Sequence, residues 1–457
     1  MTTSSKKRWP LLRYLADAVG SRMIVPTGRM VILAAGGSIL AAAGFGVGAG
    51  WTALALVNAI LLGLTVLDLS LLPRRRTLRI GRTLPPKADV GASFEVVVTV
   101  EAEQPAALWL ELADDVPQTF EAPDAPLVTA WHGRTAELRY TAKGRERGIF
   151  VFDQVQLRYR GMLGLWMKQV RKPLGQTIRI YPDLSAVRGL LSSIQQDMIL
   201  EGKKLYRKER SGSEFHTMRE YVPDDDPRSI NWRASARSRT LVTNVYRPER
   251  GKFVTILIDC GRMMGVELDG KTKLDVSLEA ALALAAVALR QGDKVAVIAF
   301  SSRIKAFVPA GAGLAHLQTI TDAVFNLQSD FVESSYSLAL QHLLKVQKKR
   351  SLTVLFSDLD NYMFEDRLLG LLQRMKRQHH LLLLGLRDEV LHGWTRVETT
   401  SKRKAYVKSV AHQLTLAREA YTARMAASGI EVIDVPVGQL AWSAVSRYLD
   451  VKAKDVL

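Results

Sequence analysis

The sequence has very little cysteine, and it lacks two motifs that are typical of hydrolases. Cys260 is the single cysteine among 457 residues, so no intrachain disulfide forms, and the chain fits a reducing compartment. There is no His-Glu-x-x-His zinc motif and no Ser-His-Asp arrangement. A hydrolase built from His216, Glu214 and Asp224–Asp226 is one alternative, but a lone histidine in a basic segment is typical of a surface residue. We therefore expect no catalytic centre.

Charged side chains are absent from residues 30–67, a stretch of 38 residues. One membrane-spanning helix needs about 20 apolar residues, so this length fits two spans. Alternating glycines at 44–50 provide a turn, and we expect spans near 30–48 and 52–72. A cleaved signal peptide is the alternative, but the 29 preceding residues are too many for a typical signal n-region. Residues 1–82 are therefore predicted to form a transmembrane hairpin with its flanks.

Basic residues flank this apolar stretch on both sides. Residues 1–82 hold eleven Lys or Arg and two Asp, in a chain whose formal net charge is +18. Positive charge on both flanks, and none in the short turn, places both termini in the cytoplasm. The large domains are then cytoplasmic at the inner (plasma) membrane. A nucleic-acid partner is not indicated, because a basic stripe would then be expected on the folded domain itself.

Residues 83–182 have the pattern of a β-sandwich domain. Runs with a period of two, such as Phe94–Val100 and Ala136–Tyr140, are separated by Pro, Gly and Asp clusters. Arg145–Phe152 adds a turn and another strand. We find no catalytic constellation and no evident site for a small-molecule substrate, so this domain is predicted to be a spacer or a binding module.

Residues 183–252 form a polar connector. Pro223–Pro227 is not expected to be helical, because a proline disfavours helical geometry at the preceding residue and aspartates favour turns. Ordering so polar a segment must be offset by contacts, and we expect Tyr221 and Trp232 to pack against the domain that follows. A solvated run of charges is the alternative. The predicted partner-binding residues are Arg219, Asp224, Asp225, Asp226, Arg228 and Trp232.

Residues 253–457 alternate strands and helices. Phe253–Asp259 is an apolar run that ends on a carboxylate, the pattern of a strand buried on both faces of a parallel sheet. A helix near 273–291 is apolar on almost every side and is predicted to be buried. The alternation continues to a last helix at 440–454 and predicts an α/β doubly wound sheet. Ligands of such sheets bind beyond the carboxyl ends of the strands.

One interpretation of this edge is a phosphate-binding loop. Gly265–Thr272 matches Gly-x-x-x-x-Gly-Lys-Thr between a strand and a helix, and Leu352–Asp358 resembles the strand that holds magnesium in such ATPases. Five residues separate Asp259 from the first glycine, however, and Glu267 and Asp269 would repel phosphate. We expect ordinary turn chemistry here, and a P-loop-type nucleotide hydrolase is the alternative function.

A second interpretation is a metal-ion adhesion site of the von Willebrand factor A type, which holds magnesium with oxygen ligands. Asp259, Ser335 and Asp358 could form a degenerate site. Such sites begin with Asp-x-Ser-x-Ser, and here both hydroxyl positions are lost, to Gly261 and Met263. Magnesium binding is expected to be weak or absent. The alternative is that the two aspartates accept hydrogen bonds from nearby backbone N–H groups.

Four motifs occur in order along the chain. They read R-x-R-G-x-F-x-F from Arg145, E-F-x-x-x-R-E-Y-V-P from Glu214, D-D-P-R-x-I-N-W-x-A-S-A-R from Asp225 and L-I-D-C-G-R-M-M from Leu257. Together with the hairpin they resemble the family called domain of unknown function fifty-eight, over nearly the whole chain. This chain departs from the usual pattern in having Asp224 in place of Gly and Asn231 in place of Asp.

The resemblance implies a von Willebrand A-like domain and, as partner, an AAA+ ATPase of the MoxR type, acting in the assembly or maturation of other proteins. Combined with the residue patterns, it predicts a multi-domain chain: an N-terminal two-helix transmembrane hairpin, a β-sandwich, a basic connector and an α/β doubly wound domain. We predict a membrane-anchored cytoplasmic adaptor or scaffold, with no enzymatic activity and no cofactor.

Overall fold

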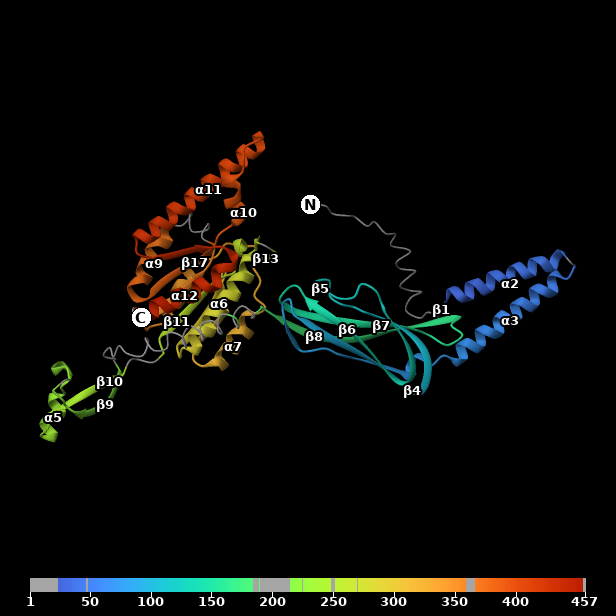
Figure 1. Ribbon diagram of the computed structural model, residues 1–457, viewed down its shortest axis with the longest axis horizontal. Helices are drawn as coiled ribbons and strands as arrows, with labels where there is room; N and C mark the ends of the chain where they lie inside the picture. The colour runs from blue at the N-terminus through green and yellow to red at the C-terminus, as the bar shows by residue number, and fades with distance from the viewer. Residues whose placement is uncertain are drawn as a thin grey trace. The chain divides into compact units, whose positions relative to one another are not determined.

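The computed structural model describes residues 24–46, 48–183, 189, 214–223, 225–247, 251–268, 270–358 and 366–454. Asp224 and Asp269, and the side chains of Glu214 and His216, lie outside what is described. The chain divides after Tyr181 into two compact units, which are considered separately (Figure 1).

The first unit begins with two apolar antiparallel helices, α2 (Gly28–Gly46) and α3 (Gly50–Leu71), close to the predicted spans. They approach each other at small residues. A Cβ at Gly37 would lie 2.6 Å from Val57 Cγ1, and one at Gly44 would lie 2.7 Å from Ala53 Cβ. Small residues at the interface are typical of helices that pack in a membrane. The two helices are thus long and apolar enough to cross a membrane.

The predicted β-sandwich is one curled sheet of eight strands. Its order is β1-β8-β7-β4-β6-β5, with β2 beside β4 and β3 beside β8. The strands are β1 (Ile24–Pro26), β2 (Leu78–Thr83), β3 (Lys87–Asp89), β4 (Ser93–Asp114), β5 (Phe120–Glu121), β6 (Leu127–Gly144), β7 (Gly148–Arg160) and β8 (Trp166–Tyr181). All pairings are antiparallel except that of β3 with β8.

The curl follows from the length of β4. Its first half pairs with β2 and β6, and its second half pairs with β6 and β7. The register of β4 on β6 shifts between Glu101 and Ala106, where the strand bends. One long strand therefore belongs to both sides of the core, and hydrogen bonding is continuous where a sandwich would have two separate sheets. Buried residues alternate with more exposed ones along most of β4, as expected for a strand with one face on the core.

The predicted polar connector is folded in its second part. β9 (Glu214–Glu220) and β10 (Val242–Arg247) form an antiparallel hairpin, and between them lie a 3₁₀ turn, η2 (Pro227–Ser229), and a short helix, α5 (Trp232–Ser238). The sequence predicted only a polar connector here, and it did not indicate the two strands and the short helix of residues 214–247. The turn at Asp225 and Asp226, in contrast, is where the two prolines predicted it.

The α/β region contains a six-stranded sheet in the order β15-β14-β11-β16-β17-β18. The strands are β11 (Phe253–Asp259), β14 (Lys294–Phe300), β15 (Ile304–Gly311), β16 (Ser351–Phe356), β17 (His380–Leu386) and β18 (Glu431–Val435). All neighbours are parallel except β14 and β15. β11 lies near the middle, between β14 and β16, and is buried from its second residue onward, as its uninterrupted apolar run predicts.

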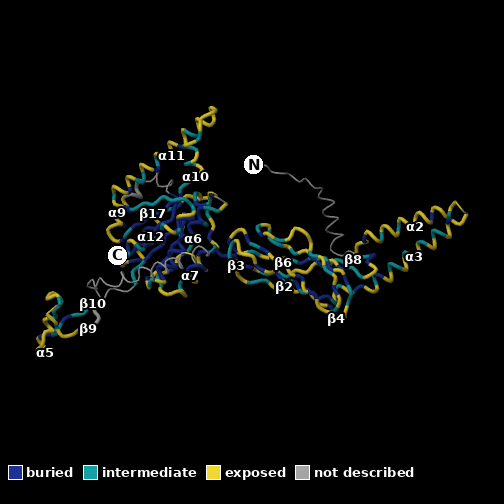
Figure 2. The backbone as a smooth tube through the Cα atoms, in the orientation of Figure 1, coloured by how far each residue is buried: buried dark blue, intermediate teal, exposed yellow. Residues whose placement is uncertain are grey.

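Helices cover both faces of this sheet, so the doubly wound prediction is confirmed. One face carries α6 (Lys273–Arg290), α7 (Leu314–Val324) and α12 (Leu440–Ala453). The other carries α8 (Tyr336–Val346), α9 (Asp366–Gln378) and α11 (Lys402–Ala427). α6 is buried along almost its whole length, as predicted (Figure 2). A short helix that the sequence did not indicate, α10 (Glu389–Arg396), pairs with α11.

Candidate functional site

The carboxylate of Asp259, at the end of β11, is fully buried and is surrounded by hydrogen-bond donors. Gly261 N lies 2.8 Å from Oδ1, while the Tyr336 hydroxyl lies 2.7 Å and the Ser357 hydroxyl 2.5 Å from Oδ2. The Ser334 hydroxyl also donates to Oδ1. These four donors come from the segments that follow β11 and β16, from the loop before α8 and from the first residue of α8. They satisfy a buried charge that would otherwise be very costly.

Of the two adjacent serines before α8, it is Ser334 whose hydroxyl donates to Asp259, while the predicted ligand Ser335 makes a different contact. Ser335 is half-buried and its Oγ lies 3.3 Å from Ser337 Oγ. A Cβ at Gly261 would collide with Ser334 Oγ. Loss of the first-loop hydroxyl at 261 therefore leaves room for a hydroxyl from another loop. Ser335 as a metal ligand stays a prediction, but Ser334 is the serine of this pair that contacts Asp259, because two adjacent serines cannot be told apart until the loop geometry is known.

Asp358, which follows β16, forms a buried ion pair with Lys273, a residue that the sequence did not indicate. Lys273 Nζ lies 2.5 Å from Asp358 Oδ2, and the two side chains are 4% and 0% exposed. Lys273 is the first residue of α6, just after Thr272, whose side chain caps the helix. The lysine supplies, beside Asp358, the positive charge that a divalent ion would supply in an adhesion site.

This arrangement argues against a metal ion between the two aspartates. Asp259 accepts four hydrogen bonds from the chain, and Asp358 is paired with a cation. Among the described residues, no group of three or more His, Cys, Asp or Glu side chains is placed to hold a metal. Weak or absent magnesium binding stays a prediction, and the geometry gives it a physical reason.

The segment that matches a phosphate-binding loop is a β-hairpin. β12 (Glu267–Leu268) pairs with β13 (Lys271–Thr272), and Gly270 has φ +78° in the turn, a conformation that favours glycine. Lys271 Nζ lies 2.7 Å from Glu279 Oε1. The Thr272 hydroxyl lies 2.6 Å from Asp275 Oδ2, within the capping box of α6. The lysine and threonine of the motif are thus both engaged in local structure, in agreement with the expectation of ordinary turn chemistry.

A fully exposed aromatic ring lies near the same edge of the sheet. Phe331 is 99% exposed and Val332 is 42% exposed, in the loop between α7 and α8. The loop is nevertheless fixed. Asp330 N donates to Cys260 O over 2.8 Å, and Arg262 N donates to Val332 O over 3.0 Å. The sequence reading overlooked this residue, because a single phenylalanine in a loop gives no periodic signal.

Charged groups hold the base of this loop. Asp330 Oδ1 lies 2.7 Å from Lys305 Nζ, and its Oδ2 lies 2.7 Å from the Ser301 hydroxyl. The hydrogen bond from Lys305 is the main cause that lowers the pKa of Asp330. The Phe331 ring therefore projects from a well-tethered loop, with little of its surface covered by the chain itself.

The described residues of the predicted partner surface divide into two groups. Asp225 accepts hydrogen bonds from Arg219 Nη2 at 2.5 Å and from Val222 N at 3.1 Å, and the Val222 bond is the largest cause that lowers its pKa. Asp226 Oδ1 accepts from Arg228 N at 3.0 Å. These contacts hold the turn. The second group is accessible: Arg228 is exposed, and Trp232 is 69% exposed. Packing of Trp232 on the α/β region stays a prediction.

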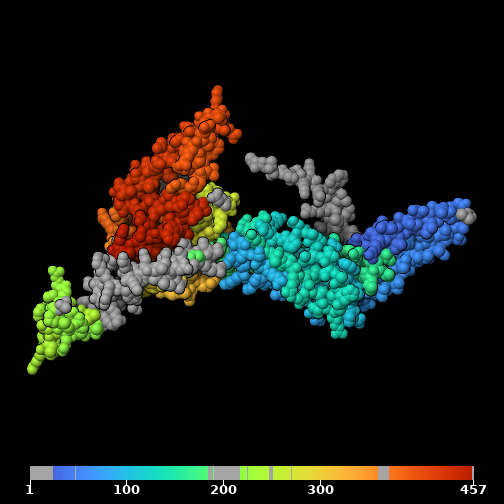
Figure 3. Space-filling view, in the orientation of Figure 1, coloured from blue at the N-terminus to red at the C-terminus, as the bar shows by residue number. Residues whose placement is uncertain are grey.

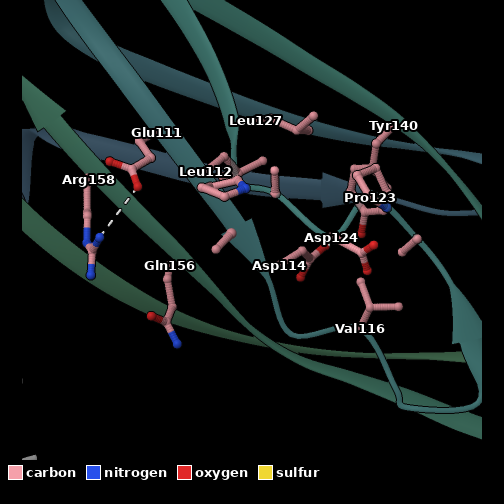
Figure 4. Close-up of a pocket in the computed structure, with 14 residues that line it drawn as sticks. Glu111, Leu112, Asp114, Val116, Pro123, Asp124, Leu127, Tyr140, Gln156 and Arg158 are labelled. Carbon is pink, nitrogen blue, oxygen red and sulfur yellow. Dashed lines mark hydrogen bonds and ion pairs between the residues drawn. The ribbon is translucent and has the colours of Figure 1, made fainter.

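Figure 4 shows a cavity of about 240 Å³ at one end of the curled sheet, lined partly by Glu111, Asp114, Tyr140 and Arg158. The Asp114 carboxylate is already engaged, because Arg82 Nη1 lies 2.5 Å from Oδ1 and the Tyr140 hydroxyl lies 2.6 Å from Oδ2. Burial, together with this bond to Asp114, raises the pKa of Tyr140. The bonds among Arg82, Asp114 and Tyr140 stabilise this part of the sheet, so Asp114 and Tyr140 have structural roles here.

Comparison with known proteins gives a family and one curated relative. A family model described as "Protein of unknown function DUF58" matches residues 217–431. The chain is 27% identical, over 176 residues, to "Uncharacterized protein YeaD" of Bacillus subtilis (strain 168). The match covers 37% of this chain and 44% of that protein, so the chain spans less than half the length of this relative.

Among solved structures, the conserved hypothetical protein BatB from Bacteroides thetaiotaomicron is 12% identical, with a TM-score of 0.29 over 45% of this chain and 100% of that chain. A beta-glucosidase from Listeria innocua is 10% identical, with a TM-score of 0.13 over 22% of this chain and 16% of that chain. At these TM-scores the likenesses support no conclusion about fold or activity.

Proposed function

Since this chain belongs to the family of proteins of unknown function DUF58, whose name assigns no activity, we propose a function from its geometry: a membrane-anchored, cytoplasmic adaptor or scaffold that is not an enzyme. In this proposal the hairpin holds the chain in the membrane, and the α/β region, of von Willebrand A-like type, binds a partner protein. The observation that carries the proposal is the exposed Phe331 ring on a tethered loop beside carboxylates that are already satisfied.

The anchor is supported by α2 and α3. Both helices are apolar and largely exposed within their own unit, and their contact is made through glycines. Exposed apolar helices of this length would be unstable in water, whereas a bilayer covers them. The basic residues on both flanks support the cytoplasmic orientation.

A binding role for the sheet edge is supported by what Asp259 and Asp358 do. Catalytic carboxylates need access to a substrate and a pKa suited to proton transfer. These two are buried, with 0% and 1% of their surface exposed, and their oxygens accept hydrogen bonds from the chain itself. What the edge offers to another molecule is an aromatic ring, and aromatic side chains dominate the binding energy of many protein interfaces.

For the partner, we propose an AAA+ ATPase of the MoxR type, as the resemblance of the connector and strand motifs implies. The exposed Arg228 and Trp232 belong to the same proposed contact surface. Tryptophan and arginine are, with tyrosine, the residues most enriched at interface hot spots.

The test is capture of the intact protein from native membranes, solubilised in a mild detergent, with identification of what comes with it. We expect a MoxR-type AAA+ ATPase to be recovered with the wild-type chain and to be recovered less, by tenfold or more, with Phe331→Ser, because loss of a buried aromatic anchor costs about 2 kcal/mol or more.

Leu314→Ser is the matched control. Leu314 is also apolar and 61% exposed, but it is the first residue of α7. β15, the strand before α7, ends next to the start of β14, so Leu314 follows the end of the sheet opposite to Asp259. Recovery with this control should equal the wild type. Absence of any AAA+ ATPase, or equal recovery with the Phe331 variant, would contradict the proposal.

A further inference from the structure

The hairpin and the curled sheet meet at the turn between β7 and β8, residues 161–165, which we call the junction turn. Asp68 of α3 is 1% exposed and accepts hydrogen bonds from Leu165 N at 3.0 Å and Trp166 N at 2.7 Å. Thr27, just before α2, donates from its hydroxyl to Gly164 O at 2.6 Å. Figure 3 shows the hairpin, in blue, in direct contact with this green end of the sheet.

Further contacts seal the junction. Trp166 Nε1 donates to the Thr65 hydroxyl over 3.2 Å, and Lys168 Nζ lies 3.0 Å from Leu72 O at the end of α3. Burial is the main cause that lowers the pKa of Lys168. The sheet is therefore fastened to the hairpin by side chains of both parts, and the position of the junction turn along the helices is fixed.

That position is at the boundary of a bilayer. Asp68 lies 18 residues after Gly50, which is about 27 Å along a helix. The hydrocarbon core of a bilayer is about 30 Å thick. Trp51, 77% exposed at the far end of α3, suits the opposite interface, where tryptophan is common. When the hairpin spans the bilayer, the junction turn lies at the level of the lipid headgroups and the first acyl carbons.

An apolar cleft opens at this level between the two helices and the junction turn. Its walls are Ile32, Leu33, Leu64, Leu163 and Leu165, and its one charged lining residue is Arg29, in the first turn of α2. Ile32 is 73% exposed, and Met162, beside the cleft residue Leu163, is 78% exposed. Arg29 Nη1 makes a long contact of 3.4 Å with Leu163 O. A guanidinium has five N–H donors, so this leaves most of them for another group.

We propose that this cleft binds one glycerophospholipid of the surrounding leaflet. Its acyl chain lies along the leucine and isoleucine walls, and its phosphate accepts hydrogen bonds from Arg29. The chemistry is complementary, because guanidinium pairs bidentately with phosphate and the cleft is otherwise apolar. The basic residues Arg74 and Arg75 after α3 add to the attraction for an anionic headgroup. The proposal rests on the membrane anchoring proposed above and adds a specific ligand to it.

The experiment uses the full chain, purified in a mild detergent and titrated with phosphatidylglycerol, with bound lipid counted by native mass spectrometry. We expect one phosphatidylglycerol to be retained by the wild type. Arg29→Gln should weaken its binding about tenfold, the effect of losing a charge-assisted hydrogen bond. Arg76→Gln, which removes the same charge from the exposed segment after α3, should change it less than twofold.

A second pair of variants tests the apolar wall. Ile32→Trp fills the cleft and should reduce retained lipid, whereas Leu40→Trp, at a position of α2 that is 67% exposed and not part of the cleft, should not. Equal lipid retention by the two Trp variants, or by the two Arg variants, would overturn the proposal.

Insertion is measured separately, as resistance of the membrane-bound chain to extraction by alkaline carbonate. A wild-type chain that is extracted would disprove the anchor, and this site with it. A chain that stays inserted but binds lipid equally in every variant would disprove the lipid site alone.

Discussion

The ammonium of Lys273 lies 2.5 Å from the carboxylate of Asp358, with both side chains almost completely buried. The two residues are 85 positions apart in the sequence, and α6 brings the lysine to the end of β16. Such a pair contributes little net stability relative to apolar residues, but removing one partner leaves a buried charge without compensation. The pair therefore makes the edge of the sheet sensitive to single substitutions.

We expect Lys273→Met to destabilise the α/β region by about 3–5 kcal/mol, because Asp358 stays buried and unpaired. Hydrogen exchange of the slowest amides in β11 and β16 measures this opening free energy. The double variant Lys273→Met with Asp358→Leu should lose less, because it leaves no lone charge. A single variant as stable as the wild type would show that water reaches Asp358.

Magnesium should affect the wild type and the Lys273→Met variant differently. Millimolar magnesium should leave the thermal stability of the wild type unchanged, because Lys273 already compensates Asp358. In Lys273→Met the ion can take the place of the ammonium between hard oxygen ligands, so a rise in stability is expected. If magnesium stabilised the wild type, and Asp259→Ala and Asp358→Ala each abolished that effect, the wild-type edge would be a metal site.

ATP should not bind at Gly265–Thr272. This segment is a hairpin whose Lys271 is paired with Glu279, so no backbone cradle and no free ammonium are presented. Calorimetry with magnesium-ATP should show no saturable binding in the micromolar range. The control is Lys271→Ala, which should give the same heats. Saturable binding that this substitution removes would restore the nucleotide hydrolase as the leading function.

The membrane orientation can be read with single introduced cysteines, because Cys260 is fully buried. Glu333→Cys, at a side chain that is 79% exposed, should be protected from impermeant thiol reagents in intact cells and react after lysis. Ala49→Cys, in the turn between α2 and α3, should react in intact cells. Labelling of position 333 from outside would reverse the proposed orientation.

Acid should weaken the sheet near β17. Burial lowers the pKa of His379 and of His380 below the usual value near 6.5. The unfolded chain therefore binds more protons than the folded chain as the pH falls below about 6.5, so stability that is complete above this pH is lost below it.

Protection factors from hydrogen exchange across β16 and β17, measured between pH 7.5 and 5.5, would show this effect. His379→Phe should flatten the pH dependence, while His412→Gln, at an exposed position of α11, should leave it as in the wild type. Protection that does not change with pH in the wild type would mean that protonation of these histidines is not coupled to unfolding.

The strands and helices of the α/β region were largely predictable from the sequence. β11 has the predicted bounds, because five apolar residues and one threonine run without interruption to Asp259. α6 and α12 lie close to the helices predicted near 273–291 and at 440–454. The helix α10 was missed. It has eight residues, too few for a periodic pattern to stand out.

The arrangement of the β domain and of the sheet edge was not predictable in the same way. Alternating residues are equally typical of a sandwich and of one curled sheet, and only the length and pairing of β4 decide between them. Ser334, Lys273 and Phe331 were missed for a related reason. Their roles depend on which loop lies beside Asp259 and Asp358, and a local pattern contains no information about that.

Because Asp68 and Thr27 fasten the junction turn, we expect the curled sheet to tilt together with the hairpin in the proposed membrane anchor. β7 runs from the junction at Arg160 to Gly148, about 40 Å away at the usual rise of a strand. Membrane helices change their tilt, over a range of tens of degrees, to match the thickness of the bilayer. A change of about 20° in the tilt of the hairpin would displace the far end of β7 by roughly 14 Å. The thickness of the bilayer would then determine the position of the far end of the sheet.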